Sequence, residues 1–241
     1  MGDYLFRRKA NSGTGFLEIG LESWIKWDSM IISDEEIPGA YSYCNREERA
    51  RFIVEQFGWA LKEPLLDVGC GEKHLQQALP EGFDYTGLDF IDRADVHCNL
   101  DRDKIPFKQK SFNTVVCTDV LEHLEHIHDV FNDLLGIASR YVIVSLPNCW
   151  SDLKYLMLKG RGSGKYYGLP SNRPEDRHRW FFNYSEARQF LIDNSTGKVS
   201  KLNLYRYYAK GGITYKAGRL FLPAHIYRDL FVHTLWAVIE I

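Results

Sequence analysis

The sequence predicts an α/β fold in which helices cover both faces of a largely parallel, doubly wound sheet. Short apolar runs alternate with helical patterns between residues 46 and 148, as in successive strand–helix–strand units. The first apolar run ends in an acid and breaks at Gly69 and Gly71 before a helical pattern begins. A buried strand that turns sharply into a helix in this way indicates a ligand-binding loop.

Composition favours one domain with additions. The chain has 241 residues, 45% of them hydrophobic, which is enough for a full core. We find no apolar run of about eighteen residues and no apolar signal core at the start, so we expect a cytoplasmic protein without a membrane span. None of the five cysteines forms a CxxC pair, which argues against a disulfide framework or a zinc cage. Those at the ends of predicted strands are expected to be buried.

Charge is unevenly distributed along the chain. The net charge is −2, yet residues 151–220 contain 14 Lys and Arg against 5 Asp and Glu. Such a basic block suggests contact with an anionic partner. A solvated surface that happens to be basic explains the same composition, and both interpretations stay open.

The elements before the glycine loop are a short extension and a helix. Residues 1–45 are rich in aromatic side chains, and a short helix within residues 16–32 would present Trp24 and Trp27. From Arg46 to Leu61, apolar residues recur at helical spacing. We expect this second helix to lead into the first strand of the sheet.

The glycine loop lies in the segment PLLDVGCGEKHL, residues 64–75. It is no dinucleotide fingerprint, because His74 stands where the third glycine would fall. Nor does the chain contain a phosphate-binding loop of the GxxxxGK type followed by Ser or Thr. What remains is an acid, Asp67, before a GxG sequence. This resembles motif I of the class I S-adenosylmethionine-dependent methyltransferases, and Lys73 in place of a third glycine is a small departure.

The resemblance implies S-adenosylmethionine as cofactor, with the loop backbone along its methionine part. The residues that it assigns there are Asp67, Gly69, Cys70 and Gly71.

The second and third strands end in polar residues. The second, 85–89, ends in Asp89, about twenty residues past the loop, where an acid binds ribose hydroxyls. Its carboxylate accepts two hydrogen bonds at once. It matches motif II of the same family, and we include the adjacent Phe90 in the site. After the third strand, 94–98, come Asn99 and Leu100, which the resemblance places beside the adenine.

The fourth strand, 114–118, is preceded by a segment that resembles the LPF-x-x-x-SFD sequence of this family. We assign Thr118 and Asp119, at its end, to the cofactor site. On a helix start, Asp119, Glu122 and His123 would share one face. Such a group suits a divalent cation or a general base.

This segment is also similar to the VLEH element of the ubiquinone-biosynthesis O-methyltransferases, in which equivalent residues are associated with a metal. Because EH pairs are frequent in related enzymes without a known metal, we assign none and favour His123 as a base or a structural residue. A helix at 129–139 and a fifth strand at 141–146 follow. The pattern from residue 46 to 148 thus matches a class I methyltransferase core.

A basic insert, residues 150–183, stands where the family shapes its acceptor pocket. It begins with a helix at 152–158 and contains Arg177, His178, Arg179 and Trp180. These side chains could clamp an anionic or sugar-like acceptor, with His178 as a second candidate base. The alternative is a purely structural role, as an ordered loop held by its aromatic residues. The segment also resembles proteins of the methionine-biosynthesis W type.

The chain ends in a helix at 183–193, a strand at 198–208, a helix at 220–231 and a strand at 233–241. Asn183 and Glu186 form a capping-box pattern for the first of these helices. The ending resembles the family's antiparallel hairpin with a helical insertion, which gives a Rossmann-like, seven-stranded sheet. Residues 220–241 could instead touch a membrane surface, but we favour a core position.

We therefore expect a class I methyltransferase domain at residues 46–241, with residues 1–45 as a lid or a strap. The implied activity is O-methylation of a polar or anionic small molecule or glycoconjugate, with His123 and His178 as catalytic residues. The alternative is a non-catalytic, cofactor-binding accessory protein of the W type. Nucleic acid is a less expected acceptor, because the Asn/Asp-Pro-Pro-aromatic motif of amino-methylating enzymes is absent. The oligomeric state stays open.

Overall fold

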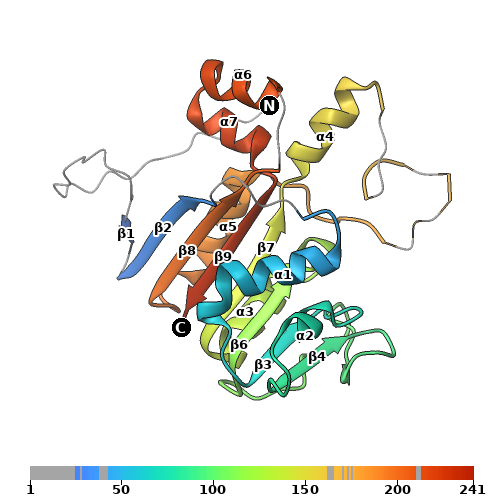
Figure 1. Ribbon diagram of the computed structural model, residues 1–241, viewed down its shortest axis with the longest axis vertical. Helices are drawn as coiled ribbons and strands as arrows, with labels where there is room; N and C mark the ends of the chain where they lie inside the picture. The colour runs from blue at the N-terminus through green and yellow to red at the C-terminus, as the bar shows by residue number, and fades with distance from the viewer. Residues whose placement is uncertain are drawn as a thin grey trace, which may run out of the picture.

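A single mixed sheet forms the centre of the computed structural model (Figure 1). The strand order is β1-β2-β8-β9-β7-β6-β3-β4-β5. The strands are β1 (Ile25–Trp27), β2 (Met30–Glu36), β3 (Leu65–Val68), β4 (Tyr85–Asp89), β5 (Val96–His97), β6 (Phe112–Thr118), β7 (Ala138–Pro147), β8 (Lys201–Tyr207) and β9 (Thr234–Glu240). The structure describes residues 25–27, 29–37, 43–161, 166–169, 171–172, 174, 176–209 and 213–241.

Helices connect most of the strands. They are α1 (Arg46–Phe57), α2 (His74–Ala78), α3 (Ile127–Ile137), α4 (Cys149–Leu158), α5 (Tyr184–Ser195), α6 (Ile213–Phe221) and α7 (Ala224–Phe231), with 3₁₀ turns at Gly58–Ala60 and Leu121–His123. Among the described residues, no helix is both long and apolar enough to cross a membrane.

The predicted Rossmann-like sheet with an antiparallel C-terminal hairpin is confirmed. Strands β5, β4, β3, β6 and β7 pair in parallel, and β9 runs antiparallel to both β7 and β8. Helices α6 and α7 lie between β8 and β9 in sequence, as the predicted insertion requires. Two strands of the N-terminal segment extend this seven-stranded core, because β2 pairs in parallel with β8 and β1 pairs with β2.

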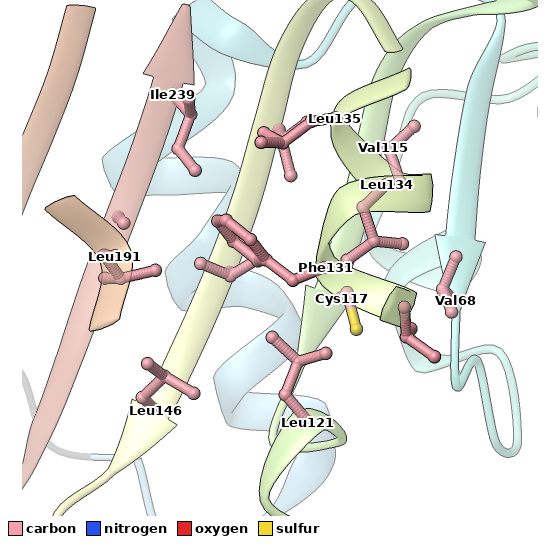
Figure 2. Packing of buried hydrophobic residues seen from close by; sticks show 14 of the residues in the cluster. Val68, Val115, Cys117, Leu121, Phe131, Leu134, Leu135, Leu146, Leu191 and Ile239 are labelled. Carbon is pink, nitrogen blue, oxygen red and sulfur yellow. The ribbon is translucent and has the colours of Figure 1, made fainter. Parts of the chain in front are cut away.

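Both faces of the sheet are covered, and the alternation of side chains along the strands explains why. In β9, Leu235, Ala237 and Ile239 join the apolar cluster formed with α3 and α5, while Trp236 and Val238 join the one formed with α1. Figure 2 shows the first cluster, with Phe131 of α3 and Leu191 of α5 above the strands. All residues from Leu235 to Ile239 are at most 1% exposed, so the last strand belongs to the core as predicted.

The second apolar cluster is built on aromatic rings. Phe52 and Phe57 of α1 lie with ring centroids 5.2 and 5.5 Å from that of Trp236. Both ring pairs are tilted, and aromatic pairs add about 0.5–1.5 kcal/mol each beyond the area that they bury. The predicted helix at 46–61 is thereby held across the middle of the sheet.

The N-terminal edge of the sheet is fastened by Asp34 of β2. Its carboxylate accepts hydrogen bonds from the Tyr184 hydroxyl and from the guanidinium of Arg206, and Arg188 Nε lies 3.1 Å away. Next to it, the Ser33 hydroxyl donates to Asn203 Oδ1 at 3.0 Å. One carboxylate therefore ties β2 to both β8 and α5.

Two predicted helices differ from the structure. The helix within 16–32 is wrong where it can be compared, because residues 25–27 and 30–32 are strand. Met30 and Ile32 are buried while Ile31 is exposed, and this period of two fits the open edge of β8. The rest of that segment lies outside the described residues, as do most of the proposed lid and residues 162–165 of the basic insert. The helix at 220–231 is broken at Pro223, and its first part, α6, begins at residue 213.

Replacement of Asp34 by alanine is expected to lower the free energy of unfolding by about 3 kcal/mol, because it leaves the partly buried Arg206 without its carboxylate partner. Urea denaturation measures the change. The exposed Glu35 of the same strand provides the control, and Glu35→Ala should change stability by no more than about 0.5 kcal/mol. Equal effects of the two substitutions would contradict this account of the edge.

Candidate active site

A cavity of about 1230 Å³ opens at the carboxyl ends of the parallel strands. Its walls come from the loops after β3, β4, β5 and β6, from one face of α1, and from the insert around residues 174–180. This is the position where open α/β sheets bind ligands. The residues predicted for the cofactor all line it, together with His123: Asp67, Gly69, Cys70, Gly71, Asp89, Phe90, Asn99, Leu100, Thr118 and Asp119.

The glycine loop presents bare main chain to this cavity. Gly69 and Gly71 have φ values of 75° and 51°, in the left-handed region that favours glycine. A Cβ atom on Gly69 would lie 2.3 Å from Val120 Cγ2, which leaves no room for a side chain. The Gly69 N–H donates to the Leu88 carbonyl at 2.8 Å, so the loop is held against the neighbouring strand.

Asp89 joins the two loops at the tips of β3 and β4. Its Oδ2 accepts the Gly71 N–H at 2.9 Å, and its Oδ1 accepts the Phe90 N–H at 2.7 Å. Each carboxylate oxygen retains a further lone pair for a ligand. Phe90, beside it, is 65% exposed.

Asp67 lies beneath the loop. It accepts a hydrogen bond from the Tyr85 hydroxyl at 2.7 Å and is only 6% exposed. Burial raises the pKa of its carboxyl to about 6, against the opposing effect of the Tyr85 hydrogen bond. The two predicted acids thus differ, because Asp67 supports the loop from below while Asp89 fixes its rim.

Asn99 and Cys70 are held by their own turns. The Asn99 amide oxygen accepts the Asp101 N–H at 3.1 Å, and the Asn99 main-chain N–H donates to Asp103 at 3.0 Å. Cys70 is buried against Gly87, where an added Cβ would lie 2.9 Å from its sulfur. Both residues therefore shape the cavity wall through rigid backbone.

The segment after β6 departs from the predicted helix start. Asp119 has a φ of 51°, and its N–H donates to the Ser145 hydroxyl oxygen at 2.9 Å. Its carboxylate accepts the Ser145 hydroxyl at 2.5 Å and pairs with Arg49. The prediction that Asp119, Glu122 and His123 share one helix face is therefore wrong, because Asp119 adopts a left-handed conformation before the 3₁₀ turn begins.

Helix α1 contributes residues that the sequence analysis missed. Arg46, Arg49, Ala50 and Ile53 line the cavity, and a Cβ on Gly71 would lie 3.6 Å from Arg46 Nη1. Their spacing of i, i+3, i+4 and i+7 is one helix face. The signal from which these cavity residues could have been predicted was the presence of two arginines on the inward face of an amphipathic helix.

A cluster of titratable groups lies behind His123. Glu122 is 1% exposed, and neither carboxylate oxygen has a hydrogen-bond partner among the described residues. His123 Nε2 lies 3.6 Å and His178 Nε2 3.8 Å from Glu122 Oε1. Burial, followed by the charge of Asp119, raises the pKa of Glu122 well above its usual range.

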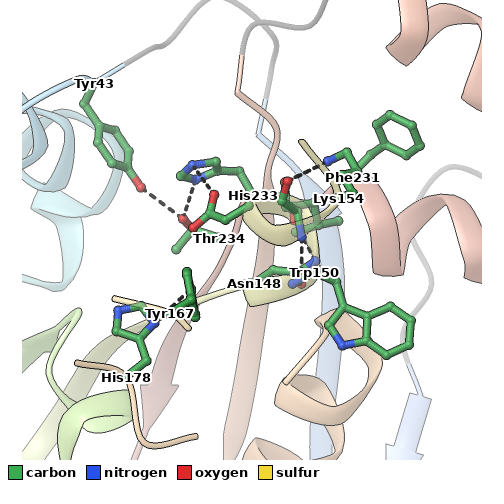
Figure 3. A network of polar contacts seen from close by, with 12 residues as sticks. Tyr43, Asn148, Trp150, Lys154, Tyr167, His178, Phe231, His233 and Thr234 are labelled. Atoms are coloured by element: carbon green, nitrogen blue, oxygen red, sulfur yellow. Dashed lines mark hydrogen bonds and ion pairs between the residues drawn. The ribbon is translucent and has the colours of Figure 1, made fainter. Parts of the chain in front are cut away.

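His178 is the one predicted site residue that does not line the cavity. It is 5% exposed and lies behind His123, with ring centroids 4.7 Å apart. Its Nδ1 lies 2.9 Å from the Tyr167 hydroxyl (Figure 3). Burial and the neighbouring His123 lower its pKa to about 4.

The insert forms the outer wall through bonds to the 122–125 segment. The Arg179 N–H donates to the Glu122 carbonyl at 2.8 Å, and Trp180 Nε1 donates to the Leu124 carbonyl at 2.6 Å. The Arg179 guanidinium lies 2.6 Å from Glu125 and 3.0 Å from Asp101. Of the four residues in the predicted clamp, Arg177, Arg179 and Trp180 line the cavity, and Arg179 is already paired with two acids.

The chain matches a known protein family and is similar to several solved structures. A family model described as a methyltransferase domain matches residues 44–191. A S-adenosylmethionine-dependent methyltransferase of Thermotoga maritima, described as a possible histamine N-methyltransferase, is 11% identical, with 81% of this chain and 93% of that one covered and a TM-score of 0.51. A S-adenosylmethionine-dependent methyltransferase of Clostridium acetobutylicum is 10% identical, with 82% and 92% covered and a TM-score of 0.50.

The small RNA methyltransferase HEN1 is 14% identical, with 85% of this chain and 27% of that one covered and a TM-score of 0.51. A search of curated proteins gave no match. At these identities the likeness to solved structures concerns the fold.

Gly69→Ala is expected to destabilise the protein by about 1–3 kcal/mol more than Gly82→Ala. Both glycines have positive φ, so both substitutions cost about the same backbone strain, but only the Cβ at position 69 meets a side chain. Urea denaturation of the two variants gives the difference directly. Equal destabilisation would mean that Val120 moves away freely.

Asp67→Asn is expected to change the pH dependence of stability. Because the folded state raises the pKa of Asp67 to about 6, its contribution to stability is present at low pH and decreases as pH rises from about 4 through about 6. The wild type should therefore lose on the order of 2–3 kcal/mol relative to the variant between pH 4 and pH 7. Urea denaturation at each pH tests this, with Asp92→Asn as the baseline for an exposed aspartate. A constant difference would contradict the raised pKa.

Proposed function

Because this chain belongs to the methyltransferase domain family, we propose that it transfers a methyl group from S-adenosylmethionine to a hydroxyl oxygen of a polar acceptor. The observation that carries the proposal is the single cavity that joins the glycine loop, Asp89 and His123. Its volume of about 1230 Å³ exceeds the roughly 300–1,000 Å³ of most small-molecule sites. The cavity therefore has room for a cofactor and an acceptor together.

The residues of the cavity fit this cofactor. Neither Gly69 nor Gly71 has a side chain, so a ligand can lie directly against the main chain there. Arg46, beside Gly71, is suited to binding a carboxylate. Asp89 keeps free lone pairs for two ribose hydroxyls, and Asn99 and Leu100 form the wall for a base. When bound, S-adenosylmethionine supplies a methyl group on a sulfonium that is its own leaving group.

The protein's own contribution is to orient the acceptor and exclude water. The insert supports this role, because its bonds to Glu122 and Leu124 fasten it as the outer wall. His123 lines the cavity and is the candidate base for an acceptor hydroxyl, whereas a base role for His178, behind it, stays a prediction. The ion pairs of Arg49 with Asp119 and of Arg179 with two acids favour a hydroxyl-bearing acceptor over an anionic one.

Calorimetric titration with S-adenosylmethionine tests the cofactor site. We expect micromolar affinity for the wild type and a loss of about 10–100-fold in Asp89→Ala, since that change removes charge-assisted hydrogen bonds and releases the loop from Gly71. Asp92→Ala, an exposed neighbour outside the cavity, should bind as the wild type does. Absence of binding in the wild type would overturn the proposal.

A labelled methyl donor then identifies the acceptor. The panel contains polyols and sugars, catechols, and a small RNA, the substrate class named for HEN1. Methylation at a hydroxyl supports the enzyme. Cofactor binding without transfer to any acceptor would instead favour the alternative, a non-catalytic accessory protein.

A further inference from the structure

We propose that Glu122, His123 and His178 bind one divalent transition-metal ion at the inner wall of the cavity. The ligand atoms are a carboxylate oxygen of Glu122 and one ring nitrogen of each histidine, all within 4.8 Å of one another. In both histidines Nε2 is the nitrogen that faces Glu122 Oε1. Two of the three come from the turn after β6, and the third comes from the insert, 55 residues further along the chain. The cluster therefore exists only in the folded protein.

The distances suit a common metal ion. Two ligands of a tetrahedral site with bonds of about 2.1 Å lie about 3.4 Å apart. In this cluster, Glu122 Oε1 lies 3.6 Å from His123 Nε2 and 3.8 Å from His178 Nε2. Both separations are too long for a hydrogen bond but close to that of two ligands on one ion.

The hydrogen bonds of His123 fix its tautomer. Its Nδ1 lies 2.7 Å from Asp176 Oδ1 and 3.2 Å from the Arg177 carbonyl oxygen. Both of these groups only accept hydrogen bonds, so we assign the ring proton to Nδ1. His123 Nε2 then faces Glu122 with a lone pair.

The tautomer of His178 follows from Tyr167 and Asp152. The Tyr167 hydroxyl lies 2.9 Å from His178 Nδ1 (Figure 3), and burial and the charge of nearby Asp152 raise the pKa of Tyr167. Because the Asp152 carboxylate only accepts, we assign the Tyr167 proton to its side, so that the hydroxyl oxygen accepts the proton on His178 Nδ1. His178 Nε2 also faces Glu122 with a lone pair.

Three electron-pair donors thus face one another in a buried space. A buried carboxylate without a partner costs several kcal/mol, and neither oxygen of Glu122 has a hydrogen bond among the described residues. A divalent cation satisfies all three donors at once. Asp176 and Tyr167 take the place of the outer partners that orient metal-binding imidazoles.

The donor set also indicates the class of ion. Two imidazole nitrogens with one carboxylate favour first-row transition metals such as Mn²⁺ and Zn²⁺, whereas Mg²⁺ and Ca²⁺ prefer oxygen ligands throughout. Since His123 lines the cavity, the ion would border it. If the proposed function holds, on which this step rests, an acceptor hydroxyl would complete the coordination of the metal ion there. His123 would then act as a metal ligand in place of a general base.

Metal titration of chelator-treated protein tests the site without any enzymatic assay. Calorimetry with Mn²⁺ and with Zn²⁺ should give one ion per chain, and electron paramagnetic resonance reports bound Mn²⁺ independently. Glu122→Gln and His178→Ala should weaken binding at least 100-fold, and Tyr167→Phe, which removes an orienting partner, about tenfold. His126→Ala removes an exposed histidine outside the cluster and should bind as the wild type does.

Thermal unfolding separates loss of the site from loss of the fold. Saturating Mn²⁺ should raise the Tm of the wild type and of His126→Ala, but not that of Glu122→Gln. If Glu122→Gln fails to fold, His178→Asn decides in its place. No stoichiometric binding, or equal affinity in the wild type and the cluster variants, would overturn the proposal. Glu122→Gln should still bind S-adenosylmethionine, so failure of the metal site and failure of the cofactor site are distinguishable.

Discussion

The parallel pairing of β3 with β4 and β6 determines where the site can form. Val68 is aligned with Leu88 on one side and with Cys117 on the other. The three strands therefore end at one level, and their next residues, Gly69, Asp89 and Thr118, come together although they are far apart in sequence. Every later feature of the cavity depends on this register, because a shift by one residue would turn each side chain to the opposite face of the sheet.

The parts that the sequence could predict are those with local signals. The glycine loop and Asp89 follow from residue types at fixed places after a strand, and the capping box of Asn183 and Glu186 is complete within four residues. Strands with two buried faces were recognisable as continuous apolar runs, as in β7. The periodicity of α1 predicted its helix, and the structure adds that its inward face carries Arg46 and Arg49.

The parts that escaped prediction depend on contacts between distant residues. The pairing of β2 with β8 joins positions about 170 residues apart, and its bond from Ser33 to Asn203 has no local signature. The same holds for Arg49 and Asp119, 70 residues apart. The assumption that Asp119, Glu122 and His123 share a helix face failed because Ser145 of the adjacent strand β7 accepts the Asp119 N–H, which favours a left-handed turn there.

The left-handed turn at Asp119 separates the carboxylates of Asp119 and Glu122, whose electrostatic environments differ. Asp119 is compensated, since it pairs with the Arg49 guanidinium and accepts the Ser145 hydroxyl. Glu122 is buried, and burial and the charge of Asp119 raise its pKa more strongly than the charge of Arg49 lowers it. Two imidazole nitrogens lie 3.6 and 3.8 Å from Glu122 Oε1, and in the assigned tautomers their protons are on the opposite side of each ring. A bound proton would neutralise Glu122 alone. A metal ion would satisfy the two imidazoles as well, and this difference is the physical reason for assigning the cluster to a cation.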